Sequence, residues 1–157
     1  RIAFFMKTKV LMVCLGNICR SPLAEGILKS KVDDSVIVES AGTGGWHAGE
    51  TPDPRSIAIA RENGIDITDQ RARKFSPRDL DTYDYIYAMD NSNYRDILSH
   101  AKHTHQTKKV KLILNEVYSG ENLSVPDPYY GGEGGFKRVF DMLDAACNKI
   151  VEKLKAK

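Results

Sequence analysis

The stretch VLMVCLGNICRSPLAEGILK, residues 10–29, combines a short apolar run, a glycine-containing loop and an amphipathic segment. Residues 10–13 form the continuous apolar run that is typical of a strand buried on both faces. Pro22 can occupy the first turn of a helix, where its missing N–H is not needed, and the apolar residues after it recur at helical spacing. The stretch therefore predicts a strand, a tight loop and a helix in immediate succession.

Short apolar runs and helical patterns go on alternating along the rest of the chain. Further strands are expected at 36–38, 83–89 and 110–114, and helices at 54–63, 92–98 and 136–154. Strands that alternate with helices predict a parallel sheet covered by helices on both faces. We therefore expect an α/β fold, a single three-layer α/β/α domain with a four-stranded parallel sheet, over residues 6–157. Residues 1–5 precede what reads as a natural start at Met6 and are expected to lie outside this domain.

Composition and charge argue against several classes of protein. The 157 residues include 23 Lys and Arg against 21 Asp and Glu, a formal net charge of +2, which is far from the basic footprint of a nucleic-acid-binding protein. No apolar run is long enough to span a bilayer. Three cysteines are too few, and odd in number, for a secreted disulfide scaffold, and they favour a reducing, cytoplasmic compartment. We expect neither a nucleic acid nor a membrane as partner.

The loop after the first strand has the chemistry of an anion-binding site. Its successive backbone N–H groups can curl around a phosphate, and the helix beyond it adds unpaired donors and a positive dipole end. Gly16 and Asn17 tolerate the left-handed backbone angles that a tight curl requires. Arg20 offers a planar fork that matches two phosphate oxygens. The residues expected to hold the phosphate are Leu15, Gly16, Asn17, Ile18, Cys19, Arg20 and Ser21.

Cys14 opens this loop and is the candidate nucleophile. Donors that hold an anion also stabilise a thiolate, and Ser21 can donate its hydroxyl to the sulfur. A cysteine at a strand end can equally be a small buried apolar residue, and Arg20 a solvated charge. The second alternative is weaker, because an unpaired cation is unfavourable at the positive end of a helix. The loop therefore favours a reactive cysteine beside a bound anion.

These residues resemble the low-molecular-weight protein tyrosine phosphatases, whose signature is C-x5-R-[ST] directly after an N-terminal strand. The chain reads VCLGNICRSP at 13–22, and the likeness continues at ESAGT (39–43), Trp46, MDNSN (89–93) and DPYY (127–130). The resemblance implies hydrolysis of phosphotyrosine in proteins, and of small aryl phosphates, through a phosphocysteine intermediate. It implies no metal and no cofactor, and inorganic phosphate or vanadate as inhibitors.

The resemblance also assigns roles outside the loop. Asp127 matches the general acid, although an Asp-Pro pair is also an ordinary turn. Trp46 matches an aromatic that stacks on the substrate ring, and a partly buried loop anchor is the alternative. Tyr129 and Tyr130 resemble the aromatic wall of the substrate cleft, and surface packing is the alternative for both.

The same resemblance implies supporting residues. Asn17 and Ser40 match residues that hydrogen-bond each other and hold the phosphate loop in shape. Asp90 matches an acidic residue near the site, and a helix N-cap is an equally good interpretation. Many relatives carry a His where this chain has Gln70, so that position receives no role.

The remaining cysteines and histidines receive different interpretations. Cys19 and Cys14 share one curled loop, so we predict a reversible disulfide that guards the nucleophile; a second structural thiol is the alternative. Cys147 belongs to the apolar stripe of the last helix and is expected in the core. The irregular spacing of His100, His103 and His105 favours a solvated loop over a metal site.

Other functions are compatible with the same first loop. In the branch of protein-arginine phosphatases a Thr occupies the position of Ile18, so this apolar residue favours tyrosine. An arsenate reductase relays oxidation through further cysteines near the third strand, and residues 80–95 contain none. A phosphocysteine carrier uses a similar loop without the Arg or the acid. A non-catalytic phosphotyrosine reader is expected to lack Cys14 or Asp127.

Overall fold

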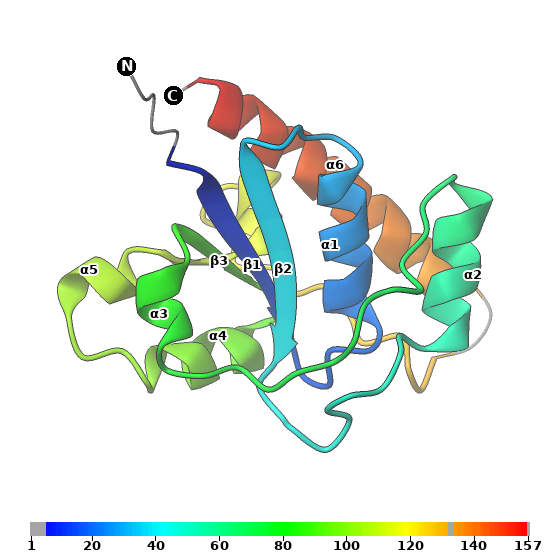
Figure 1. Cartoon of the computed structure of the whole chain (residues 1–157), viewed down its shortest axis with the longest axis horizontal. Helices are drawn as coiled ribbons and strands as arrows, with labels where there is room; N and C mark the ends of the chain where they lie inside the picture. The colour runs from blue at the N-terminus through cyan, green and yellow to red at the C-terminus, as the bar shows by residue number, and fades with distance from the viewer. Residues whose placement is uncertain (1–5, 132–133, 157) are drawn as a thin grey trace.

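Four parallel strands form one sheet in the order β2-β1-β3-β4 (Figure 1). The computed structural model describes residues 6–131 and 134–156. The strands are β1 (Thr8–Cys14), β2 (Val36–Gly42), β3 (Tyr85–Ala88) and β4 (Val110–Leu112). The prediction of an α/β fold with a four-stranded parallel sheet is confirmed.

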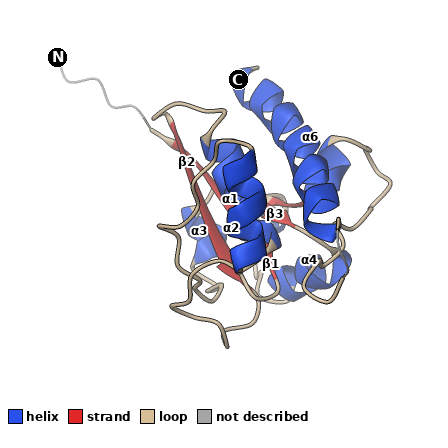
Figure 2. Ribbon diagram, turned by 90° about the vertical axis from the view of Figure 1, so that its right-hand side faces the viewer, coloured by secondary structure: helices blue, strands red, loops and turns tan. Residues whose placement is uncertain are grey.

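Helices cover both faces of this sheet. They are α1 (Arg20–Lys29), α2 (Pro54–Glu62), α3 (Asp79–Thr82), α4 (Asn91–Leu98), α5 (Thr104–Thr107) and α6 (Gly135–Lys155), with a 3-10 turn η1 (Ile113–Glu116) after β4. Figure 1 shows α1, α2 and α6 on one side of the strands and α3, α4 and α5 on the other, and Figure 2 looks onto the first of these sides, with α1 and α2 in front of the strands. Within the described residues, no helix is both long and apolar enough to cross a membrane.

β1 lies inside the sheet and contributes to the cores on both faces. Val10 and Met12 pack in the cluster that α1 and α6 complete, while Leu11 and Val13 belong to the cluster on the opposite face. All four side chains are fully buried. The uninterrupted apolar run of the sequence is therefore the signature of a strand covered on both sides. Cys147 is buried in the α6 core, as predicted.

Three local expectations are wrong in detail. The strand expected at 83–89 is shorter, because Tyr83 ends α3 and turns its hydroxyl to Glu39. The strand expected at 110–114 passes into η1 after Leu112. The helical pattern at 54–63 predicts Ala58 on the buried face, but Ala58 is exposed, because Ser56 and Ala60 form the buried face of α2. The helices α3 and α5 were not expected, since about one helical turn is too short to show a periodicity.

The strand order reverses direction at β1, and this places the site. The unit β1-α1-β2 extends to one side, whereas β3 and β4 join the other side of β1. In open parallel sheets the loops beyond the carboxyl ends of two such strands leave a crevice for a ligand. The residues 14–21 and 90–93, which follow β1 and β3, meet at this crevice.

Candidate active site

The loop at residues 14–21 keeps its first carbonyl groups turned outward. The N–H groups of Thr43 and Gly44 donate to the carbonyl oxygens of Cys14 and Leu15, each at 2.9 Å. Gly42 stands at this contact, where an added Cβ would lie 2.7 Å from the Leu15 oxygen. The chain after β2 can therefore approach the loop this closely only with glycine at that position.

The N-terminus of α2 holds the second half of the loop in the same way. The Asp53 N–H donates to the Ile18 carbonyl at 2.8 Å, and the Ser56 hydroxyl donates to the Cys19 carbonyl at 3.2 Å. Ser56 is fully buried, so this contact is shielded from water. Four carbonyl groups of the loop are thus bound from outside.

The N–H groups of the loop are left for a ligand. Those of Leu15, Gly16, Ile18 and Cys19 have no acceptor among residues 6–131 and 134–156. Four donors in one curl, followed by the unpaired first turn of α1, are suited to an anion with several oxygens. Within this loop only Asn17 takes the left-handed backbone, at φ 58°, whereas Gly16, which also tolerates it, does not adopt it.

Asn17 is the residue that holds this curl together. Its Nδ2 donates to Ser21 Oγ at 2.7 Å and to Ser40 Oγ at 3.0 Å, and its Oδ1 accepts the Arg73 N–H at 3.0 Å. Ser40 in turn donates to Glu25 Oε1 at 2.6 Å. All three polar groups of this amide are therefore used, which fixes the side chain and supports the left-handed backbone.

The Cys14 sulfur lies at the base of the loop and faces donors. The Asn17 N–H points to Sγ at 3.3 Å, and Ser21 Oγ lies 3.1 Å from it. Because the Asn17 amide already donates to Ser21 Oγ, the Ser21 hydroxyl hydrogen is available to the sulfur. Both contacts stabilise a thiolate.

The other two thiols lie in different surroundings. Burial raises the pKa of Cys19 to about 12, with further contributions from Asp53 and the Cys14 sulfur. Burial likewise raises the pKa of Cys147 to about 12. Both groups are protonated at neutral pH.

Arg20 is a buried cation that reaches from α1 to the loops beyond β3 and β4. Its Nη1 donates to Asp90 Oδ2 at 2.7 Å and to the Val125 carbonyl at 2.9 Å. Burial lowers the pKa of this guanidinium, but the Cys14 sulfur and Asp90 outweigh it and raise the pKa above its ordinary value. Asp90 also caps α4, since its Oδ1 accepts the Asn93 N–H at 2.7 Å. Asp90 is therefore both an acidic residue beside the site and the N-cap of α4.

Asp127 lies beside Arg20, on the loop between η1 and α6. Its Oδ2 is 3.6 Å from Arg20 Nη2, and its Oδ1 accepts the Tyr129 N–H at 3.0 Å. The side chain is 37% exposed, so a proton can be exchanged with solvent. The loop is held just upstream, where the Val125 N–H donates to the Met89 carbonyl at 2.8 Å.

A cleft of about 300 Å³ joins these groups. The side chains around it are Cys14, Leu15, Gly16, Ile18, Cys19, Arg20, Trp46, His47, Asp127, Tyr129 and Tyr130. The sulfur and guanidinium are almost fully buried at its base, whereas Trp46 is 65% exposed at the rim. Gly44 makes room for the indole, because a Cβ there would lie 2.0 Å from a ring carbon. The large exposed fraction of Trp46 favours a ring that can meet a ligand over the alternative, a partly buried loop anchor.

The two tyrosines of the cleft differ from each other. The rings of Tyr129 and Tyr130 meet edge to face, with centroids 4.9 Å apart. Tyr129 is 40% exposed and Tyr130 is 91% exposed. Tyr129 is therefore the better fixed part of the wall, and Tyr130 extends it toward solvent.

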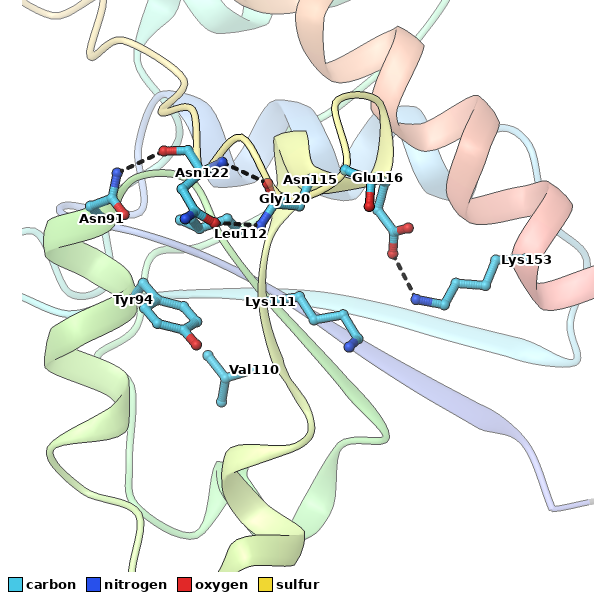
Figure 3. Close-up of a pocket in the computed structure, with 11 residues that line it drawn as sticks. Asn91, Tyr94, Val110, Lys111, Leu112, Asn115, Glu116, Gly120, Asn122 and Lys153 are labelled. Carbon is cyan, nitrogen blue, oxygen red and sulfur yellow. Dashed lines mark hydrogen bonds and ion pairs between the residues drawn. The ribbon is translucent and has the colours of Figure 1, made fainter.

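A second, larger cavity of about 510 Å³ lies along β4 and away from the sulfur (Figure 3). Asn115 and Asn122 exchange two hydrogen bonds there, at 3.0 and 2.9 Å. Asn91 Nδ2 donates to the Asn122 carbonyl at 3.1 Å, and Lys153 forms an ion pair with Glu116 (Figure 3). These bonds fasten the segment that leads toward Asp127, so this cavity lies beside the support of the loop that carries Asp127.

Three residues that support the site could not be identified from the sequence. Glu25, Arg55 and Arg73 support the loops, and each makes its decisive contact with a residue distant in the sequence. Gln70, to which the sequence assigns no role, is buried, and its side chain donates to the Pro22 carbonyl at 3.1 Å. Every predicted catalytic and wall residue lines the cleft, while Asn17, Ser21, Ser40 and Asp90 support it.

Comparison with known proteins agrees with this geometry. The family model described as low molecular weight phosphotyrosine protein phosphatase matches residues 9–157. A low molecular weight phosphotyrosine protein phosphatase of Schizosaccharomyces pombe is 44% identical over 134 residues, which cover 82% of this chain and 85% of that protein. A protein tyrosine phosphatase from Entamoeba histolytica, solved with Hepes in the active site, has a TM-score of 0.88 and 37% identity over 96% of this chain and 98% of its own. A Drosophila arginine phosphatase has a TM-score of 0.84 and 33% identity over 94% of this chain and 98% of its own. The chain therefore belongs to the low molecular weight phosphotyrosine protein phosphatase family and is a phosphatase.

Proposed function

We propose that this protein hydrolyses phosphotyrosine in proteins through a phosphocysteine intermediate. The observation that carries the proposal is one cleft in which a buried sulfur, a buried guanidinium and a half-exposed carboxylate face the same space. Each has a distinct task in the hydrolysis of a phosphate monoester, and none of these tasks needs a metal.

In the first step Cys14 Sγ attacks phosphorus as the bond to the tyrosine oxygen breaks. The free N–H groups of the loop and Arg20 hold the remaining phosphate oxygens, so negative charge is stabilised by donors that are already in place. Asp127 gives its proton to the departing phenolate oxygen. The products of this step are free tyrosine hydroxyl and a phosphorylated Cys14.

In the second step water attacks the phosphocysteine from the side where the phenol left. Asp127, now ionised, accepts the proton of that water, and the sulfur leaves as a thiolate. The Ser21 hydroxyl, 3.1 Å from Sγ, can donate to the returning negative charge. Inorganic phosphate is released and the enzyme regains its starting state. Phosphate and vanadate should therefore compete for the same loop.

The walls of the cleft favour an aromatic phosphate. Trp46 and Tyr129 present ring faces and edges at the rim, where a phenyl ring can stack above a phosphate held at the base. Ile18 contributes an apolar side chain to the wall, and its carbon atoms cannot accept hydrogen bonds from the N–H groups of a phosphorylated guanidinium. The alternative of a protein-arginine phosphatase is kept because the Drosophila enzyme shares the fold.

Turnover of peptides that carry phosphotyrosine, phosphoserine or phosphoarginine tests the substrate class. We expect kcat/KM for phosphotyrosine to exceed that for phosphoserine by about 10²-fold or more, because the shorter serine stem leaves phosphorus out of reach of the sulfur. A higher kcat/KM for phosphoarginine than for phosphotyrosine would favour a protein-arginine phosphatase instead. Equal values for phosphoserine would contradict the aromatic-walled cleft. A stable phosphoprotein without release of phosphate would indicate a carrier instead.

Peroxide treatment tests the proposed pairing of Cys14 and Cys19. Oxidation of the Cys14 thiolate gives a sulfenic acid, which the Cys19 thiol can convert to a disulfide with release of water. Because the pKa of Cys19 is raised to about 12, we expect closure to quicken about tenfold per pH unit over pH 6–9, as its thiolate fraction grows. Mass spectrometry should show the loss of two hydrogens at this pair, reversed by a dithiol reductant. Over-oxidation of Cys14 with no such species would leave Cys19 as a structural thiol.

A further inference from the structure

Arg55 lies at the start of α2 and is fixed to the phosphate loop through Asp53. Its Nη2 and Nε donate to the two carboxylate oxygens of Asp53 at 2.9 and 3.0 Å, a bidentate pair. The Asp53 side chain is only 7% exposed, and the Asp53 N–H donates to the Ile18 carbonyl at 2.8 Å. The guanidinium is thus held at a set distance from the loop that carries Cys14.

The other contacts of Arg55 lie on the loop that carries the acid. Its Nη1 donates to the Tyr129 carbonyl at 3.2 Å. Its central carbon lies 5.4 Å from the centre of the Tyr129 ring and 4.6 Å from that of Phe136, both within the range of cation–π attraction. One side chain therefore joins α2 to the acid loop and to the first turn of α6.

Tyr129 passes this constraint to Asp127. The Tyr129 N–H donates to Asp127 Oδ1, while the Tyr129 carbonyl and ring are held by Arg55. Upstream, the Val125 carbonyl accepts from Arg20. The carboxylate therefore lies between one anchor at Arg20 and a second at Arg55. Without the second anchor, the carboxylate remains tied to the tyrosine, but the tyrosine is no longer tied to α2.

We propose that Arg55 is a positioning residue for general acid catalysis: it sets the place of Asp127 relative to Cys14 by clamping Tyr129 against α2. This inference rests on the proposed function, because it matters only if Asp127 transfers a proton. Arg55 itself is not among the residues around the cleft. Its effect should accordingly depend on how much the leaving group needs a proton.

Arg55→Gln, assayed with two aryl phosphates, tests the clamp. We expect kcat/KM for phenyl phosphate, whose leaving group needs a proton, to fall about tenfold. For 2,4-dinitrophenyl phosphate, whose leaving group departs as an anion, kcat/KM should stay within about twofold of the unmodified protein. Arg61→Gln removes an exposed arginine from the other end of the same helix and serves as the matched control, with no expected change on either substrate.

A double variant separates positioning from a general loss of structure. In an Asp127→Ala background, Arg55→Gln should alter kcat/KM for phenyl phosphate by no more than about twofold, since the group that it positions is gone. Equal losses on both substrates, or a full further loss in that background, would overturn the positioning role. If the unmodified protein hydrolysed neither aryl phosphate, the proposed function itself would fail. If it hydrolysed both and Arg55→Gln left phenyl phosphate unchanged, only the clamp would fail.

Discussion

Cys14→Ser is expected to remove turnover of every phosphate ester, with kcat lowered by about 10⁴–10⁶-fold, the scale on which other enzymes lose activity with a residue of the catalytic unit. The replacement keeps the shape of the side chain and the contacts of the loop. It replaces the sulfur, whose anion accepts hydrogen bonds from the Asn17 N–H and Ser21, with a hydroxyl. A serine hydroxyl stays protonated at neutral pH beside the same two donors and is therefore a much weaker nucleophile. Release of phosphate from p-nitrophenyl phosphate measures the effect.

Two controls distinguish a lost nucleophile from a damaged fold. Cys147→Ala removes a thiol that is buried in the α6 core, and it should retain turnover within about threefold because Cys147 lies outside the cleft. Inorganic phosphate should still raise the melting temperature of Cys14→Ser, because the N–H groups of the loop and Arg20 are unchanged. Substantial turnover by a Cys14→Ser protein that binds phosphate would rule out a phosphocysteine intermediate.

The centre of the fold could be predicted from the sequence because its signals are local. Val10 and Met12 face one core and Leu11 and Val13 the other, and a strand buried on both faces has to read as a continuous apolar run. The loop that follows is equally local, since Cys14 and the donors that face its sulfur lie within eight residues. Such contacts need no knowledge of how distant segments pack.

The supports of the site could not be predicted, because they depend on which segments the fold brings together. The pair of Arg20 and Asp90 spans 70 residues, and that of Arg55 and Tyr129 spans 74. On the sequence alone Arg55 reads as an exposed charge at a helix start, which is also the weaker of the two interpretations of Arg20. What separates the two arginines is the burial of one and the reach of the other to the acid loop, and both come from the packing of α1 and α2 around the end of β1.

Asp127→Ala is expected to lower kcat/KM for phenyl phosphate by about 10²–10⁴-fold, the contribution typical of a positioned general acid. For 2,4-dinitrophenyl phosphate the loss should be far smaller, so rates over a series of aryl phosphates should fall more steeply as the leaving group becomes more basic.

Asp127→Asn is the decisive partner of Asp127→Ala, because an amide oxygen can still accept the Tyr129 N–H at 3.0 Å and keep the turn, whereas an amide cannot transfer the proton. If Asp127 acts through its proton, both variants should be slow with the same dependence on the leaving group. If it only shapes the turn, Asp127→Asn should approach the unmodified protein while Asp127→Ala does not. The second outcome would reassign Asp127 to the support of the cleft and leave the departing phenolate without a donor in this loop.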